Sequence, residues 1–410
     1  MKKLILFITV VLAVNAVFAA GFGIYEASPR GNALGGTLVG STRDASAVYY
    51  NPANMTEMTN VSVMVGVSFI NPFCDTKVDG IGQPKMNPGW FVDPTFYATI
   101  PLPADFALGI GGFSEFGLGT KYGTNWMLAG DTIETTIKQY TLNPVLAYKV
   151  TDWWSIAGGL KMSYITFNNK KHPLNGFPGL PRHAFSSELD GHDYAIGYNF
   201  ATDFKILDNL SFGLHYRSML KHDIKGDFTM KGPTIPGLMA PPYHLPAAAR
   251  LDLPQSITGG INWDATEKLH LGFVATWTQW SSVDNIKFRI PQFGYNEPLH
   301  WKDAWRFGWG AEYDLTDDFA VRLGYVHDRD PSGKHGTTML PPGDRHIIGT
   351  GFGWYVWRTL RLDVGYNFII MQDSERDITL KANGAVYGKH HFECRNSFSH
   401  IASVGLSYTF

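Results

Sequence analysis

This chain has few charged residues, and after Ala19 it has no apolar run long enough to cross a bilayer as a helix. Asp, Glu, Lys and Arg make up 17% of its 410 residues, against about 25% in typical soluble proteins. A spanning helix needs about 20 consecutive apolar residues. If the protein lies in a membrane, it must do so as a closed β-barrel, because open strands cannot satisfy their backbone hydrogen bonds in lipid.

The sequence also lacks the motifs of metal and cofactor chemistry. It has only two cysteines and no Gly-rich phosphate loop, and none of its 14 histidines has the His-Glu-x-x-His spacing of a zinc site. Ser399 and His400 are adjacent and so face opposite sides of a strand, which excludes a catalytic triad there. We therefore expect no metal, no cofactor and no enzyme activity.

The charge balance gives no support for nucleic-acid binding. The formal net charge is -2. Removing Lys2 and Lys3 with a leader peptide leaves 32 basic against 36 acidic residues, a net charge of -4.

The N-terminus has the order of a secretory signal peptide. Met1-Lys2-Lys3 is followed by an apolar run from Leu4 to Val14 and by the small-residue site Val17-Phe18-Ala19. We predict that residues 1–19 are a signal peptide cleaved after Ala19. An uncleaved membrane helix is the alternative, but the apolar run is too short for it.

The last residues of the chain alternate between two faces. Apolar and aromatic side chains from Phe398 to Phe410 alternate with small or polar ones from Ser399 to Thr409. A final strand with one lipid face and one lumen face, ending on Phe, is typical of bacterial outer-membrane barrels. A half-buried strand of a soluble sandwich has the same pattern. The abundant Tyr and Trp, 19 and 12, favour the membrane.

Alternation and turn signals predict fourteen strands, which form one antiparallel transmembrane barrel over residues 59–410. They cover about 60–71, 90–101, 104–114, 132–150, 153–168, 188–206, 209–225, 253–264, 268–283, 301–314, 318–329, 343–356, 359–372 and 396–410. Short turns alternate strictly with long loops, as they do between the periplasmic and extracellular ends of such barrels. A soluble all-β fold gives no reason for this alternation.

The mature N-terminal residues 20–58 lack a strand pattern but contain many small and apolar residues. A barrel of fourteen strands is wide enough to need filling. We expect this segment to form a hatch, or plug, inside the lumen. A disordered periplasmic tail is the alternative, against which its Leu, Val, Phe and Tyr content argues.

Short motifs along the chain resemble the FadL/TodX (OMPP1) family of outer-membrane long-chain fatty acid transporters and their aromatic-hydrocarbon relatives. They are Ala20-Gly-Phe, Leu34-Gly-Gly, Asp44-Ala-Ser-Ala-Val-Tyr-Tyr-Asn-Pro-Ala-Asn-Met55, Phe116-Gly-Leu-Gly-Thr-Lys-Tyr122, Asn125-Trp126, Asn143-Pro144, Ala147-Tyr148, Leu253-Pro254, Trp301-Lys-Asp-Ala-Trp-Arg-Phe307 and Asp344-Arg-His346. The resemblance implies a hatch motif at Asn51, Pro52 and Ala53. It also implies capture of a ligand by loops, binding inside the barrel and lateral exit beside a kinked third strand.

The third predicted strand contains Gly109, Gly111 and Gly112. Glycines inside a strand mark bulges or kinks. We expect a kink at these three residues, with close packing against a neighbouring backbone as the alternative.

The loop at residues 115–131 is too apolar for an idle external loop. Its candidates for a capture groove are Phe116, Leu118, Tyr122, Trp126, Met127 and Leu128. The loop at 235–243 is also apolar. The alternative is that these loops pack on one another as a cap.

A carboxylate ligand would need an inward-facing cation. By strand parity, Lys302 and Arg306 lie on the lumen face in the outer half of their strand and are our headgroup candidates. The alternative is that lumen cations such as these pair with acids such as Glu312 or Asp363 and only hold the hatch.

The two cysteines fall together in the predicted barrel. Cys74 follows the first strand and Cys394 precedes the last. These strands are neighbours in a closed barrel, and the compartment is oxidising. We predict a Cys74–Cys394 disulfide at the extracellular rim.

These observations predict an outer-membrane channel for hydrophobic compounds, and the family resemblance implies long-chain fatty acids as the expected substrate. The alternatives are an aromatic-hydrocarbon or alkane channel and a general diffusion porin. Expected partners are the hydrophobic ligand, outer-membrane lipid and lipopolysaccharide, with no nucleic acid, and the protein is expected to be a monomer.

Overall fold

The computed structural model describes residues 21–87, 89–235, 241–332, 337–339, 343–382 and 385–410. The predicted signal peptide therefore lies outside the described residues. The helical segments are α2 (Pro29–Ala33), α3 (Ala47–Tyr50), η1 (Pro52–Glu57) and η2 (Trp280–Ser282). The strands are β1 (Ser62–Val78), β2 (Ile81–Gly82), β3 (Phe91–Pro101), β4 (Phe106–Phe113), β5 (Gly117–Lys121), β6 (Glu134–Thr151), β7 (Trp154–Lys171), β8 (Ser186–Leu207), β9 (Leu210–Arg217), β10 (Leu220–Lys231), β11 (Tyr243–Leu253), β12 (Ser256–Asp264), β13 (Leu269–Thr278), β14 (Asn285–Arg289), β15 (Tyr295–Pro298), β16 (Ala304–Thr316), β17 (Phe319–Asp328), β18 (Arg345–Trp357), β19 (Leu360–Met371), β20 (Ser374–Ala382) and β21 (Ala385–Thr409).

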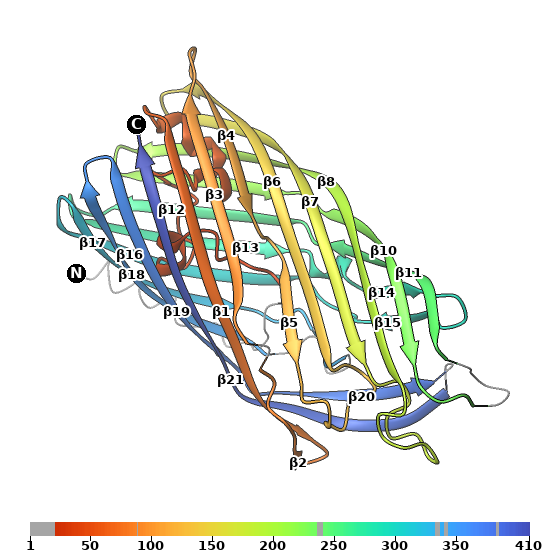
Figure 1. The fold of residues 1–410 in the computed structure, drawn as a ribbon. Helices are drawn as coiled ribbons and strands as arrows, with labels where there is room; N and C mark the ends of the chain where they lie inside the picture. The colour runs from red at the N-terminus through yellow and green to blue at the C-terminus, as the bar shows by residue number, and fades with distance from the viewer. Residues whose placement is uncertain (1–20, 88, 236–240, 333–336, 340–342, 383–384) are drawn as a thin grey trace.

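The strands form one closed antiparallel barrel (Figure 1). β1 pairs with β3 on one side and with β21 on the other, where Ser62 lies opposite Thr409. The barrel has 14 spanning strands, as the sequence predicted. Some of these strands consist of two segments, such as β9 with β10 and β12 with β11. The last strand is longer than predicted. β21 begins at Ala385, and its first part forms a hairpin with β20 beyond the end of β19.

The wall has an apolar outer face. Along β8, the outward side chains of Tyr194 and Ile196 are 74% and 77% exposed, whereas Asn199 and Ala201 on the lumen side are buried. Large apolar side chains this exposed in a continuous band need a lipid environment. Among the described residues, no helix is long and apolar enough to span a bilayer.

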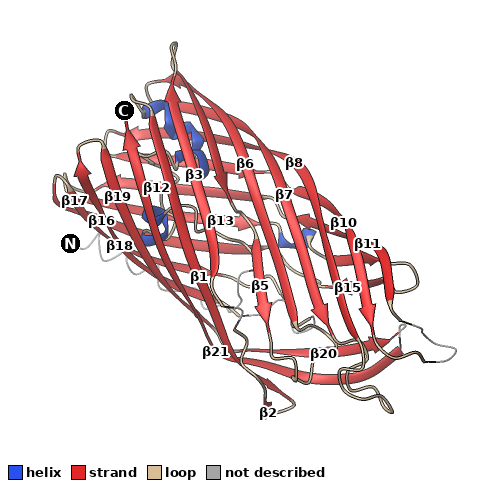
Figure 2. Cartoon of the chain, viewed as in Figure 1, coloured by secondary structure: helices blue, strands red, loops and turns tan. Residues whose placement is uncertain are grey.

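Residues 21–58, called the hatch below, lie inside the barrel (Figures 1 and 2). α2 packs against β17, β18 and β19, whereas η1 packs against β4, β6, β7 and β8. Ser28 caps α2 by accepting a hydrogen bond from the Gly31 amide, and Asn51 caps η1 in the same way. Helices this short do not hold together alone, so the surrounding wall holds them in place.

Glycines on the lumen face give the hatch backbone room. A Cβ on Gly324 of β17 would lie 2.6 Å from the Ala33 carbonyl oxygen, and one on Gly349 of β18 would lie 2.7 Å from that of Asn32. A Cβ on Gly365 of β19 would lie 2.6 Å from the Pro29 carbonyl oxygen. The wall is therefore shaped to seat the α2 backbone, which the sequence did not indicate.

The predicted disulfide is present. The sulfurs of Cys74 and Cys394 are 1.99 Å apart and their Cα atoms are 5.9 Å apart. The bond joins β1 to β21 where the pairing of β1 shifts between Phe73 and Asp75. It ties the first external segment to the β20–β21 hairpin.

The seat of the hatch can be tested with Gly324→Ala. The added methyl group would meet two hatch backbone atoms, Ala33 O and Gly35 N, at 2.6 Å, and such overpacking costs about 1–3 kcal/mol. We expect the hatch to shift, which should raise the swelling rate of liposomes in small sugars. Gly158→Ala on β7 is the matched control, because the nearest neighbours of its Cβ would be the Phe200 ring at 3.3 Å and the Asn199 carbonyl at 3.9 Å, not the hatch. Equal swelling for both variants would show that the close approach does not hold the hatch.

Candidate functional site

The barrel wall is interrupted between β3 and β5. β3 pairs with β4 from Pro101 opposite Ala107 to Phe96 opposite Gly112. Beyond that point β3 continues to Phe91 but pairs only with β1, and β5 pairs only with β6, in the described pairings. The facing edges of β3 (residues 91–95) and β5 (residues 117–121) are therefore not joined; we call this the wall gap.

The interruption lies beyond the glycines that were predicted to cause it. Regular pairing of β4 with β6 continues through Phe113, and the break falls at residues 114–116. Gly109 and Gly111 instead make room for the hatch: a Cβ on Gly109 would lie 2.5 Å from Met55 Sδ, and one on Gly111 would lie 2.8 Å from a Val48 methyl group. Gly112 has a different neighbour, the Phe96 ring at 2.0 Å. The three glycines are therefore closely packed, but against side chains and not against a neighbouring backbone as the alternative reading had it.

The start of the hatch bonds to the chain at the wall gap. The Ile24 amide donates to the Glu115 carbonyl at 2.9 Å, and the Gly117 amide donates to the Phe22 carbonyl at 3.0 Å. Gly23 and Phe116 form an isolated antiparallel bridge. The N-terminal backbone thus supplies hydrogen bonds where the wall has lost a strand partner, so the position of the hatch and the geometry of the gap are linked.

Phe22 inserts into a buried cluster of aromatic rings. Its ring centroid lies 5.9 Å from that of Phe116, 5.1 Å from Trp280 and 5.8 Å from Trp301. These rings belong to a larger buried apolar cluster, to which β6, β7, β8, β10, β11 and β14 contribute side chains. The sequence did not single out Phe22 or Trp280, because nothing local signals that these distant segments meet.

A cavity of about 410 Å³ extends from this cluster to the wall gap. Inside the barrel its lining includes Phe22, Ile369 and Ile401, which face the lumen. At the gap its lining includes Trp90 and Val92, which are 60% and 57% exposed on the outer face. The cavity therefore passes from the lumen through the wall to the lipid side.

Charged groups also line this cavity. Arg345 donates to the Gly21 carbonyl at 2.8 Å, and Arg376, 2% exposed, donates to the Thr337 carbonyl at 3.0 Å. Three acidic residues also line the cavity: Glu26 of the hatch and Asp330 of the loop after β17 lie at its inner end, and Asp93 of β3 lies nearer the gap. Burial raises the pKa of the Glu26 and Asp330 carboxyls above their usual values.

The two predicted headgroup cations do not line this cavity. Lys302 lies in the loop before β16, so strand parity does not apply to it, and its side chain is exposed. Arg306 is buried on the lumen face, as its parity indicated, with its guanidinium 4.3 Å from the centroid of the Tyr25 ring. Sequence reasoning missed Arg376 because it lies in a hairpin that was not predicted, and it named Arg345 only as part of a family motif, without a role.

The predicted capture residues divide into two groups. Phe116 and Leu118 line the cavity. Tyr122 and Trp126 stack with their ring centroids 4.0 Å apart and, with Leu128 and partly buried Met127, pack under the β20–β21 hairpin. The cap that was the alternative therefore describes this second group. Of the loop at 235–243, residues 236–240 lie outside the described residues, and Ile235 and Tyr243 pack against the apolar cluster around Phe22.

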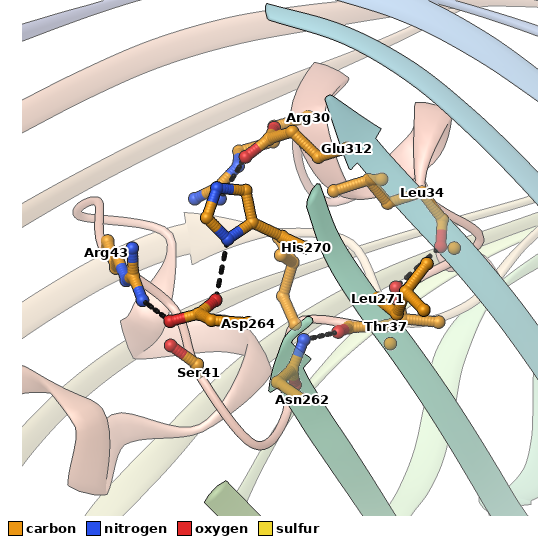
Figure 3. A pocket seen from close by; sticks show the side chains of 13 residues that line it. Arg30, Leu34, Thr37, Ser41, Arg43, Asn262, Asp264, His270, Leu271 and Glu312 are labelled. Atoms are coloured by element: carbon orange, nitrogen blue, oxygen red, sulfur yellow. Dashed lines mark hydrogen bonds and ion pairs between the residues drawn. The ribbon is translucent and has the colours of Figure 1, made fainter. Parts of the chain in front are cut away.

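Ion pairs attach the hatch to the wall on the opposite side. Arg30 bonds Glu312 of β16 at 2.8 Å (Figure 3). It also bonds Asp44 of the hatch at 3.1 Å. Arg322 of β17 also bonds Glu312, and it contacts Asp363 of β19 at 2.6 Å. Glu312 and Asp363, the two acids of the alternative reading, thus pair with Arg30 and Arg322 rather than with the headgroup candidates Lys302 and Arg306.

Two further lumen cations lie nearer the gap. Lys161 contacts Glu115 at 2.9 Å, and Arg217 contacts the same carboxylate at 3.3 Å. Glu115 is also the residue whose carbonyl bonds the hatch, so this charge network fixes the interrupted strand from inside the barrel.

The predicted hatch motif has a structural role. Asn51 Nδ2 donates to the Val39 carbonyl at 2.8 Å and to the Thr202 carbonyl of β8 at 3.1 Å. Its Oδ1 accepts from the Ala53 amide at 3.1 Å, and Pro52 begins η1. Asn51 therefore joins two parts of the hatch to each other and to the wall.

A second, smaller cavity of about 40 Å³ lies between the hatch and the wall near the short turns (Figure 3). Polar and charged side chains surround it: Arg43 contacts Asp264 at 2.5 Å, and His270 bonds the same carboxylate at 2.6 Å. It is too small and too polar to hold an apolar ligand.

The sequence and the fold were compared with known proteins. The model of the family described as outer membrane protein transport protein (OMPP1/FadL/TodX) matches residues 10–410. The long-chain fatty acid transport protein of Shigella flexneri is 23% identical over 420 residues, covering 90% of this chain and 91% of the relative.

Two solved structures share the fold. A FadL homologue of Pseudomonas aeruginosa has a TM-score of 0.84 at 20% identity, with 95% of this chain and 100% of that chain covered. The toluene transporter TbuX of Ralstonia pickettii has a TM-score of 0.71 at 17% identity, with 94% and 100% covered. At these identities the likeness is one of fold.

The ionic attachment of the hatch can be tested with Arg30→Ala. The Arg30–Glu312 side chains are 10% and 8% exposed, and removing one partner of a buried pair costs about 3–5 kcal/mol. Arg43→Ala is the control, because its pair with Asp264 is 60% and 33% exposed and should contribute about 0–1 kcal/mol. Denaturant unfolding of the folded protein in detergent measures both values. Equal losses would contradict the role given to Arg30.

Proposed function

Because the chain belongs to the OMPP1/FadL/TodX family of outer-membrane transporters for hydrophobic compounds, we propose that it takes up long-chain fatty acids and releases them sideways through the wall gap. The observation that carries the proposal is the cavity of about 410 Å³ that reaches from the aromatic cluster around Phe22 to the lipid face. The protein is a channel of this family and not an enzyme.

A sideways exit avoids the main cost of moving an apolar chain. A fatty acid loses about 0.8 kcal/mol for each CH₂ group that passes from an apolar site into water. The route down the lumen is filled by the hatch and contains ion pairs such as Arg30–Glu312. The route through the gap passes Val92 and Leu118 and ends where lipid chains lie, so the ligand stays in apolar surroundings.

The cations of the cavity favour an acid over a neutral hydrocarbon. Arg345 and Arg376 place positive charge at its inner end, beside the carboxyls of Glu26 and Asp330. A carboxylate gains from this arrangement, whereas toluene does not. The volume also lies in the range of about 300–1,000 Å³ that suits ligands larger than one ring.

The aromatic cluster supports the second candidate, uptake of aromatic hydrocarbons. Phe22, Phe116, Trp280 and Trp301 present ring edges and faces to one another at centroid distances between 5.1 and 6.0 Å. A small aromatic ligand would fit the same contact geometry. The R. pickettii structure is named a toluene transporter, and the S. flexneri relative a long-chain fatty acid transport protein.

The hatch couples ligand binding to the exit. A ligand tail that enters the aromatic cluster competes with Phe22 for the same ring contacts. Displacing Phe22 moves its own carbonyl, which accepts from the Gly117 amide, and the nearby Ile24 amide, which donates to the Glu115 carbonyl. Loss of those bonds frees the edge of the gap, so occupation of the cavity promotes release.

The carboxylate site can be tested with Arg376→Met. A hydrogen bond to a charged group contributes about 1.5–3 kcal/mol, so affinity for a long-chain fatty acid should fall roughly tenfold or more. Affinity for the fatty alcohol of equal length should not change, which separates charge recognition from damage to the fold. Isothermal titration of the purified protein in detergent measures both ligands. Lys302→Met is the control and should leave both affinities unchanged; parallel loss for acid and alcohol would exclude a carboxylate site at Arg376.

The lateral exit can be tested with Gly119→Leu. The Cβ of residue 119 would fall 1.8 Å from the Phe91 ring, which leans across the gap from β3. Two bulky side chains in the gap should slow uptake of radiolabelled fatty acid by cells severalfold while detergent binding stays intact. Gly158→Leu on the outer face of β7 is the matched control. Unchanged uptake by Gly119→Leu would place the exit elsewhere.

A further inference from the structure

The chain at the break in the wall bonds the same buried side chain twice. The backbone amides of Glu115 and Phe116 both donate to Oε1 of Gln139 on β6, at 2.9 and 3.3 Å. In a regular antiparallel strand, adjacent residues bond to opposite neighbours. Here both amides turn to one oxygen, so the chain does not continue a regular ladder with β3 through residues 114–116.

The side-chain amide of Gln139 is fully bonded. Its Nε2 donates to Thr141 Oγ1 at 2.5 Å and to Ser163 Oγ of β7 at 2.9 Å. With the two bonds to Oε1, the side chain uses both donors and both acceptor sites that an amide offers, and the residue is 1% exposed. Because backbone amides only donate, the oxygen must face the break.

Further bonds hold Ser163 in turn. Its Oγ lies 3.1 Å from Nε2 of His222 on β10, and Nδ1 of His222 lies 3.3 Å from Oδ2 of Asp193 on β8. The same Asp193 oxygen accepts from the Asp223 amide at 2.8 Å. Gln139 is thus connected to three strands besides its own, and none of these bonds involves the hatch.

The hatch start holds the other side of the break through the two backbone bonds of Phe22 and Ile24. Displacing the hatch start breaks these bonds, whereas those of Gln139 remain. Without Gln139 the amides at the break would need a new partner, since unbonded backbone groups are costly in lipid. The edge of β3 at residues 91–95 is unpaired on this side, and pairing with it would close the wall gap.

We propose that Gln139 is the positioning residue of the wall gap: it keeps residues 114–116 out of the ladder with β3, so that the gap persists when the hatch start moves. Its link to fatty acid release rests on the proposed function. The position of the break itself does not depend on which compound is transported.

The test measures the distance between spin labels on the two edges of the gap, attached through Val92→Cys and Lys121→Cys in the purified protein in detergent. Both side chains are exposed, and the two native cysteines are joined in a disulfide, so the labels attach at the new positions. Gln139→Met removes the amide but keeps the length of the side chain. We expect this variant to shorten the distance and to lower uptake of radiolabelled long-chain fatty acid by cells severalfold. An unchanged or longer distance would overturn the proposal.

Three further variants separate this role from general damage. Gln139→Glu keeps an oxygen acceptor for the two amides, so the distance should stay near that of the wild type. Ser163→Ala removes one of the two bonds to Nε2 and should shorten the distance by less than Gln139→Met does. Asn143→Leu removes another buried amide of β6, which bonds the Leu160 carbonyl and Asn199 instead of the break, and should leave the distance unchanged. A shortening in Gln139→Glu or Asn143→Leu equal to that in Gln139→Met would also overturn the proposal.

The two readouts distinguish failure of the proposed function from failure of the role given to Gln139. The uptake measurement uses cells that lack a fatty acid transporter of their own. If the wild type brings no fatty acid uptake to these cells, the proposed function fails, and the label distance still decides whether Gln139 holds the gap. If the wild type brings uptake but Gln139→Met leaves the distance unchanged, only the role of Gln139 is overturned.

Discussion

Backbone hydrogen bonding in lipid is the constraint on which the rest of this structure depends. A strand that faces hydrocarbon must bond on both edges, since no water is available to replace a missing partner. The pairing of β1 with β21 meets this demand by closing the barrel. The wall gap is the departure from it, and there the first hatch residues bond the interrupted strand on either side of Phe116. The same few bonds therefore complete the wall and position the hatch.

The hatch is held by contacts of different strength at its two ends. Around α2 its backbone lies against wall glycines such as Gly324 and Gly349, and Arg30 joins it to Glu312 through a buried ion pair. At its start it is held by two backbone bonds and by the aromatic contacts of Phe22. Contacts to aromatic rings can be exchanged for contacts to an apolar ligand, whereas a buried ion pair has no such substitute. Motion is thus expected at residues 21–24, with α2 as the fixed part.

Sequence patterns predicted the barrel well because its signals are local. Alternation within each strand, the order of short and long connections, and the two cysteines at one seam all depend on residues close in sequence or on strands whose neighbours follow from closure. Arg306 also lies on the face that its parity indicated.

The site was predicted less well because its contacts are distant in sequence. Phe22 meets Trp280 and Trp301 across the whole barrel, and no periodicity signals such a meeting. The three glycines of the third strand were linked to a kink, but Gly109 and Gly111 face Met55 and Val48 of the hatch. Parity failed for Lys302 because the strand begins two residues later.

The most direct test of a lateral exit through the wall gap is photo-crosslinking of a diazirine fatty acid to the protein in native membranes, followed by peptide mapping. The account predicts crosslinks at residues 91–95 and 117–121, on the two edges of the wall gap. Crosslinks that instead continue down the lumen to the short turns, at residues such as Asp264 and Asp314, would contradict it.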